Sequence, residues 1–432
     1  MKKYLFVTIV ILSLSLQQIS SQQYSLNQLL LQEKYSTIIS ELKDKPILNI
    51  NELLSLSVSY KQTGQLIEAI KLLEENRAGK SSSTDKLLSS LYFETGSYDK
   101  ALPLIKSIYN THPDNYKNFI RYADILTFKK EYYNAISLLN ERLATDSLNF
   151  EINKRLGDNY IKIDSLNRAI EHYATLFNTY PENQVVAFKL ARLYRNTKRY
   201  RESLNVCDTI LHYSPENIKF LNIKGGVYFK AGQYRNAIIV MKRVERLGDN
   251  SFLTQRILGI SYYKKDNYID AANYLKKAIE WKPDDPIVNY YLGASLGMLP
   301  MPEDGIPYLT ESIELLQPPS NIMEKIHNSM ANIYHKTEKY NLAIDNYKKA
   351  LKYNPKNVEY YLHIATVYDQ GLKNGKAALE YYEKYISSLP EKLDPKNGKE
   401  RYAINLKKYA ARRMVSIKEE NFFSTKYKDT NP

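Results

Sequence analysis

The chain has 432 residues, of which 25% are charged and 44% hydrophobic, as in a folded globular protein. With only 15 Gly and 16 Pro it has few residues for the turns of a strand-rich fold, and its single cysteine excludes an intramolecular disulfide. The formal net charge of +14 favours acidic partners. Because the length exceeds that of one ordinary core, an extended repeat architecture is the first organisation to test.

The N-terminus has the pattern of a cleavable signal peptide, which we place at residues 1–21. Lys2 and Lys3 precede a mostly apolar run over residues 4–16, and the small polar residues Ser20 and Ser21 follow. The run is shorter than the roughly 20 residues that span a bilayer. No cysteine lies near the expected cut, so we expect a periplasmic or secreted protein with no lipid anchor and no integral membrane segment. An uncleaved anchor is the alternative. Export also makes nucleic acid a poor candidate partner.

Small residues recur every 34 positions along the centre of the chain, which indicates an internal repeat. These anchor residues are Ala101, Ala135, Ala169, Ser203, Ala237, Ala271 and Gly305. With altered spacing the series extends upstream to Ala69 and downstream to Ala343 and Ala378. The sequence therefore predicts ten anchored repeats.

Similar residue types recur at fixed distances from each anchor. A second small residue precedes most anchors by twelve positions, at Ser89, Ala123, Gly157, Ala191, Gly225, Gly259, Gly293 and Ala331. A large residue, usually tyrosine, stands nine positions before the anchor, as at Tyr194, and another large residue stands four after it, as at Met241. Proline follows several anchors by twelve positions and closes the unit, as at Pro215.

This pattern resembles the tetratricopeptide repeat (TPR) family, whose members repeat a pair of helices over 34 residues. The resemblance implies an all-α solenoid, a right-handed superhelix of stacked helix-turn-helix repeats. We assign residues 22–49 to a partial repeat, 50–390 to the TPR array, and 391–432 to a C-terminal capping helix and tail. Pro300, Pro302 and Pro307 are expected to shorten or distort the second helix of the repeat around Gly305.

No catalytic or metal-binding pattern is present in the sequence. The six histidines are scattered and form no H-E-x-x-H pair. Cys207 takes a place that other repeats fill with Leu, Met or Tyr, which predicts a core thiol. We therefore expect no enzymatic activity, no cofactor and no metal.

The resemblance implies that the first helix of each repeat lines a concave groove. The predicted groove residues are Lys154, Lys162, Phe188, Arg192, Arg195, Lys219, Asn222, Phe229, Lys230, Arg256, Tyr263, Lys264, Tyr290 and Met298. They form a basic stretch dotted with aromatic residues, which passes into an apolar one around Tyr290 and Met298.

Such a groove predicts a non-catalytic scaffold that binds a protein or an extended acidic peptide with a hydrophobic anchor, in a cell-envelope assembly. One alternative is a binder of an anionic cell-envelope polymer or glycan. Another is that the basic residues only solvate the exposed face of a basic chain. The pattern carries no information on the oligomeric state.

Overall fold

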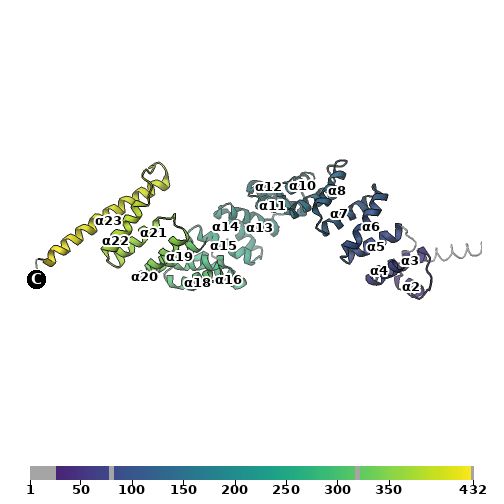
Figure 1. Cartoon of the computed structure of the whole chain (residues 1–432), viewed down its shortest axis with the longest axis horizontal. Helices are drawn as coiled ribbons and strands as arrows, with labels where there is room; N and C mark the ends of the chain where they lie inside the picture. The colour runs from purple at the N-terminus through teal and green to yellow at the C-terminus, as the bar shows by residue number, and fades with distance from the viewer. Residues whose placement is uncertain (1–25, 77–81, 317–321, 430–432) are drawn as a thin grey trace, which may run out of the picture. The chain divides into compact units, whose positions relative to one another are not determined.

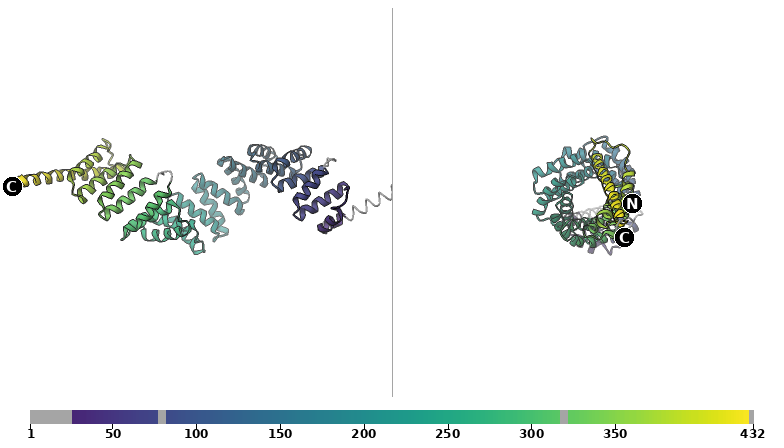
Figure 2. Two further views of the ribbon diagram at one scale, coloured as in Figure 1. Left: turned by 60° about the horizontal axis from the view of Figure 1, so that its bottom comes forward. Right: turned by 90° about the vertical axis from the view of Figure 1, so that its left-hand side faces the viewer.

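The computed structural model describes residues 26–76, 82–316 and 322–429, and every regular element in these ranges is a helix. The chain divides into two compact units, residues 1–180 and 181–432. Within each unit the helices follow one another as packed pairs (Figures 1 and 2). The predicted all-α solenoid is confirmed. The predicted signal peptide lies outside the described residues, and no helix within them has the length and hydropathy needed to cross a membrane.

The first unit begins with helical residues 26–31 and continues through nine further helices. These are α2 (Tyr35–Leu42), α3 (Ile50–Gln62), α4 (Leu66–Glu75), α5 (Ser82–Glu94), α6 (Tyr98–Thr111), α7 (Tyr116–Phe128), α8 (Tyr132–Leu143), α9 (Phe150–Lys162) and α10 (Leu166–Thr179).

The second unit carries the repeats on which the candidate site lies. Its elements are α11 (Gln184–Asn196), α12 (Tyr200–Tyr213), α13 (Ile218–Lys230), α14 (Tyr234–Arg246), α15 (Phe252–Tyr263), α16 (Tyr268–Trp281), α17 (Pro286–Gly297), η1 (Pro302–Gly305), α18 (Ile306–Leu315), α19 (Met323–Lys336), α20 (Tyr340–Tyr353), α21 (Glu359–Thr366), η2 (Val367–Gly371), α22 (Gly375–Ser387) and α23 (Gly398–Asp429).

The two helices of a repeat meet through small residues that face large ones. The anchor Ala271 is fully buried, and so is Leu275 one turn later. A Cβ atom added to Gly259 on the facing helix would lie 2.6 Å from Leu275 Cγ, which is closer than atoms can pack. The pair Gly157 and Tyr173 shows the same arrangement, with 2.6 Å to Tyr173 Cε2. The small and large residues that recur in the sequence are therefore the residues through which the two helices of a repeat contact each other.

The turn within each repeat is closed by one residue with a positive φ angle, five positions before the anchor. These residues are Gly64, Gly96, Lys130, Asp164, Lys198, Gly232, Asp266, Glu338 and Lys373. Pro300 occupies that position before Gly305, and its ring holds φ at about −65°. This repeat therefore replaces the turn with the 3₁₀ helix η1, and α18 has 10 residues where α16 has 14. The predicted shortening is confirmed.

Many of the 39 tyrosines occupy the first position of a second helix. Among the ten anchored repeats, six second helices begin with one: Tyr98, Tyr132, Tyr200, Tyr234, Tyr268 and Tyr340. The rings of Tyr98, Tyr234, Tyr268 and Tyr340 meet an aromatic side chain near the end of the preceding first helix edge to face. Examples are Phe229–Tyr234, with ring centroids 6.0 Å apart, and Tyr263–Tyr268, at 5.7 Å. Such pairs add stabilisation beyond burial alone.

The last helix, α23, is held to the array by a buried carboxylate. Asp369 lies in the π-helical turn η2, where its side chain is buried. Arg413 of α23 donates to both oxygens of Asp369, at 2.9 and 2.8 Å, and the Tyr382 hydroxyl donates at 3.0 Å. Arg413 and Asp369 therefore form an ion pair that joins α23 to the last repeat. Ala410 and Ile417 are buried beside it.

Replacing Ala237 with leucine should destabilise the second unit by about 1 to 3 kcal/mol, because the added atoms have no space against α13. Ala237 is fully buried, whereas Ile239 on the same helix is 61% exposed. Chemical denaturation of Ala237→Leu and of the control Ile239→Leu checks this. Equal stability of the two variants would contradict the repeat register.

Asp369→Asn should loosen α23 by about 2 kcal/mol, because Arg413 loses its charge-assisted hydrogen bonds. Amide hydrogen exchange over residues 398–417 measures the effect, and Glu380→Gln, in an exposed ion pair of α22, is the control. Burial raises the pKa of Asp369, but the hydrogen bonds from Arg413 and Tyr382 outweigh it and hold the pKa below its usual value. The stabilisation is therefore complete above about pH 4 and is lost as the pH falls below the lowered pKa. Protection that decreases near pH 6 would contradict this account.

Candidate functional site

The candidate site lies on the first helices of the second unit. Helices α11, α13, α15 and α17 contact one another in succession, and each packs against its own second helix or, for α17, also against η1. We call the exposed side of these four helices the first-helix face. Side-chain caps fix where its helices begin: the Asn183 side chain accepts from the backbone N–H of Val185 and Val186, and Asp285 caps α17 in the same way.

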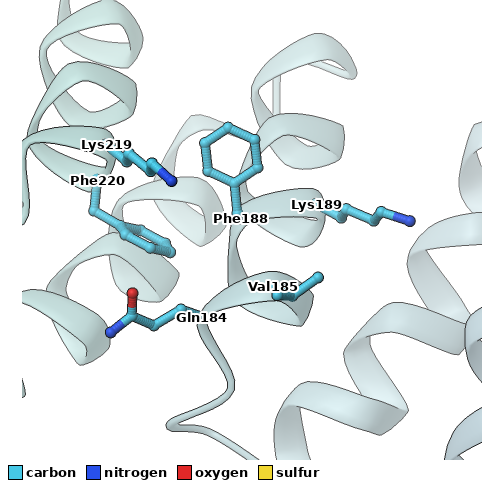
Figure 3. Close-up of a pocket in the computed structure, with 6 residues that line it drawn as sticks. All are labelled: Gln184, Val185, Phe188, Lys189, Lys219 and Phe220. Carbon is cyan, nitrogen blue, oxygen red and sulfur yellow. The ribbon is translucent and has the colours of Figure 1, made fainter.

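A pocket of about 310 Å³ opens between the first turns of α11 and α13 (Figure 3). It is lined by Gln184, Val185, Phe188, Lys189, Lys219 and Phe220. Its volume is at the lower end of the range for ligand sites, which is about 300–1,000 Å³. The pocket is therefore large enough for one or two side chains of a bound chain.

The floor of the pocket is apolar and its rim is polar. The rings of Phe188 and Phe220 meet edge to face, with centroids 6.2 Å apart, and Val185 beside them is 62% exposed. The side chains of Lys189 and Lys219 lie on either side of Phe188 in Figure 3. This arrangement suits an apolar side chain that is flanked by negative charge.

The two helices that form the pocket are linked at its lower edge. The Asn217 side chain before α13 donates to Gln184 Oε1 at 3.1 Å. One turn beyond Phe188, the Arg192 guanidinium lies over the Phe188 ring, with Cζ 5.5 Å from its centroid. Arg192 is exposed, so the positive charge continues along α11 from the pocket.

Further along the face, several predicted groove residues interact with other residues of the protein. Asn222 donates to Asp249 Oδ2 at 2.8 Å, and Arg256 Nε lies 3.9 Å from Asp285 Oδ2. Phe229 is half-buried against Tyr234. These residues shape the face, whereas Lys219 and Lys230 are exposed on it.

An aromatic cluster with a lysine occupies the end of the face, on α15 and α17. The rings of Tyr263 and Tyr291 meet edge to face at 5.1 Å, and Lys264 Nζ lies 5.4 Å from the Tyr291 centroid. Burial is the main cause that raises the pKa of Tyr263 and of Tyr291. Both phenols therefore remain neutral hydrogen-bonding groups at neutral pH.

Tyr290 corrects the sequence prediction of an exposed apolar stretch. It is only 5% exposed and packs in a core cluster with Leu309, Ile326 and Ile333. The neighbouring helix α19 covers this side of α17, which explains the burial. Met298, the other apolar residue predicted there, is 55% exposed.

The remaining predicted residues divide between the two units. Arg195 is half-buried on α11. Lys154, half-buried, and Lys162, exposed, lie on α9 of the first unit. The pocket and the arginines beside it consist of second-unit residues alone.

Sequence reasoning missed Gln184, Lys189 and Phe220 as pocket residues. It considered only positions that point away from the packing face, and Phe220 is a core residue that is 1% exposed. A signal was available, because an aromatic and a basic residue are adjacent in both helices, at Phe188–Lys189 and Lys219–Phe220.

The single cysteine, Cys207, is buried on the second helix α12. Burial raises the pKa of the Cys207 thiol to about 12, so the thiol stays protonated and unreactive at neutral pH. Among the described residues, no cluster of three or more His, Cys, Asp or Glu side chains is placed to hold a metal ion.

Two stretches of the chain match models of tetratricopeptide repeats. Family models match residues 331–371, as "TPR repeat", and residues 257–285, as "Tetratricopeptide repeat". The TPR repeat-containing protein YpiA of Bacillus subtilis is 21% identical over 370 residues, which cover 74% of this chain and 84% of YpiA. The TPR repeat-containing protein MJ1428 of Methanocaldococcus jannaschii is 24% identical over 252 residues, 54% of this chain and 43% of MJ1428.

Among solved structures, the chain is similar to one in the crystal structure of the APC/C hetero-tetramer Cut9-Hcn1. The sequence identity is 15% and the TM-score 0.43, and the match covers 89% of this chain and 95% of the other.

Proposed function

Since the chain is a tetratricopeptide repeat protein, we propose that it is a non-catalytic scaffold whose first-helix face binds a protein partner. The partner segment is extended and acidic, and it carries an apolar side chain that enters the pocket between α11 and α13. The observation that carries this proposal is the pocket itself, with Phe188 and Phe220 at its floor and lysines at its rim.

The apolar floor supports a side-chain anchor. Val185 and Phe188 leave apolar surface accessible in a concave site, and covering such surface stabilises a complex by about 25 cal/mol per Å² before the costs of association. An anchored aromatic or aliphatic side chain commonly supplies most of the energy of an interface. A ligand without an apolar group would leave this apolar surface exposed to water.

The charge of the face supports an acidic partner. Arg192, Lys219, Lys230 and Lys264 are exposed, and none of them forms an ion pair within the part of the chain that the structure describes. An acidic segment would be drawn to these cations before it docks. The role in a cell-envelope assembly is part of the same proposal and rests on the N-terminal sequence.

Selection from a random linear peptide library displayed on phage tests this proposal, and it requires no purified partner. Peptides selected on the full mature chain should combine an apolar side chain with neighbouring acidic residues. Phe188→Ala with Lys219→Glu should remove their binding, because the floor and the rim of the pocket are both lost. Lys276→Glu, an exposed charge reversal on the second helix α16, is the matched control.

Selected peptides that bind the double variant as well as the control would rule out the pocket. Salt separates this function from the binding of an anionic envelope polymer. A peptide held by its apolar anchor should stay bound at about 0.5 M NaCl, whereas a polymer held by charge alone should dissociate, because salt screens exposed charges. Peptide binding that is lost at this salt as completely as the binding of polyglutamate would favour the polymer.

A further inference from the structure

Arg195 is a cation without a counter-ion next to the pocket. It lies on α11 one turn beyond Arg192, and its Nε atom is buried with no hydrogen-bond partner. No carboxylate pairs with it among the residues that the structure describes. The guanidinium therefore bears a desolvation cost that the protein does not offset.

Electrostatics around Arg195 agree with an uncompensated charge. Burial, followed by the positive charge of Arg192, lowers the pKa of Arg195. The half-buried Arg155 in the first unit shows the opposite case: its guanidinium binds Asp124 at 2.8 and 3.0 Å and also contacts Glu151, and its pKa is raised. Acidic side chains therefore pair with the half-buried Arg155, whereas none in the described part of the chain pairs with the half-buried Arg195.

The Arg195 guanidinium packs against the adjacent first helix at a position that has no side chain. Its Nη1 atom lies 3.5 Å from the place where a Cβ of Gly226 would be, on the adjacent first helix α13. Because Gly226 has no side chain, the guanidinium can rest against α13 while Arg192 stays exposed beside it. Two guanidinium groups on successive turns offer several N–H donors to one planar or tetrahedral anion.

We propose that Arg195 and Arg192 form an oxyanion site that binds a carboxylate or phosphate group of the partner. The site deepens the proposed function and rests on it, because the same ligand would fill the pocket. Phe188 and Arg195 are seven residues apart on one helix, which corresponds to about 10 Å. An extended chain covers this distance in about three residues. The ligand therefore carries its anionic group about three residues from its apolar anchor.

Thermal melting of the full chain in matched salts tests the site with simple probes. Sodium phosphate and sodium acetate are each compared with sodium chloride at equal ionic strength. At least one oxyanion should raise the melting temperature of the wild-type protein, because a ligand that binds only the folded state stabilises it. An increase with phosphate alone would indicate that the partner's anionic group is a phosphate, and an increase with acetate would indicate a carboxylate.

Arg195→Gln should lose the site-specific part of this increment in melting temperature and keep only the general stabilisation that an excluded anion such as phosphate gives any folded protein. Its melting temperature in chloride should equal or exceed that of the wild type, because an uncompensated buried charge is removed. The exposed Arg192→Gln should weaken oxyanion affinity about tenfold, which is the loss of one charge-assisted contact. Arg201→Gln, an exposed arginine on the second helix of the same repeat, should keep the full increment.

The Arg195 Nε–H resonance gives a direct second measurement. It should shift in a saturable manner with the effective oxyanion and not with chloride. An increment as large in Arg195→Gln as in the wild type, or a resonance that responds equally to chloride, would overturn the oxyanion site.

Phe188→Ala separates this inference from the proposed function. That variant should lose the selected peptides while it keeps the oxyanion increment. If an oxyanion raises the melting temperature but no peptide is selected, only the pocket is rejected. If peptides bind in a pocket-dependent manner but no oxyanion raises the melting temperature, only the oxyanion site is rejected.

Discussion

The fold depends on close contact between small residues on one helix and large residues on the next. Gly259 against Leu275 and Gly157 against Tyr173 leave no room for even one extra carbon atom. A helix pair of this kind cannot bury its apolar face alone, so neighbouring pairs stack and share a core. The exposed side of the first helices is the surface that remains after these contacts are made. Binding residues can vary there without disturbing the packing.

First-helix cations differ in whether the protein itself pairs them with a carboxylate. In the first unit Lys61 pairs with Glu94 at 2.6 Å, and Arg155 pairs with Asp124. In the second unit Arg192 and Arg195 have no such partners among the described residues. Paired charges stabilise a repeat by themselves, whereas unpaired ones favour an external anion. We therefore propose the anion site at Arg192 and Arg195 and not at the paired cations.

Local chemistry explains much of what could be predicted. The 34-residue period identified the repeat, the anchor residues and the core position of Cys207, because tight helix contacts demand small side chains at fixed spacing. Pro300 and its neighbours predicted a shortened second helix, since proline restricts the backbone. The turns were less visible. Lys130, Asp164 and Lys198 adopt the positive φ that glycine usually provides, so residue type did not reveal the common turn.

By itself the sequence determined the all-α repeat, its register and the exposed basic residues of the first helices, because each of these follows from periodic spacing along one chain. Only the tertiary structure decided that Tyr290 is core, that Phe220 forms the floor of a pocket, that Asn222 is held by Asp249 and that Arg195 has no counter-ion. These properties arise where consecutive repeats meet. Helix periodicity gives the direction of a side chain but not the neighbour that reaches it from the next repeat.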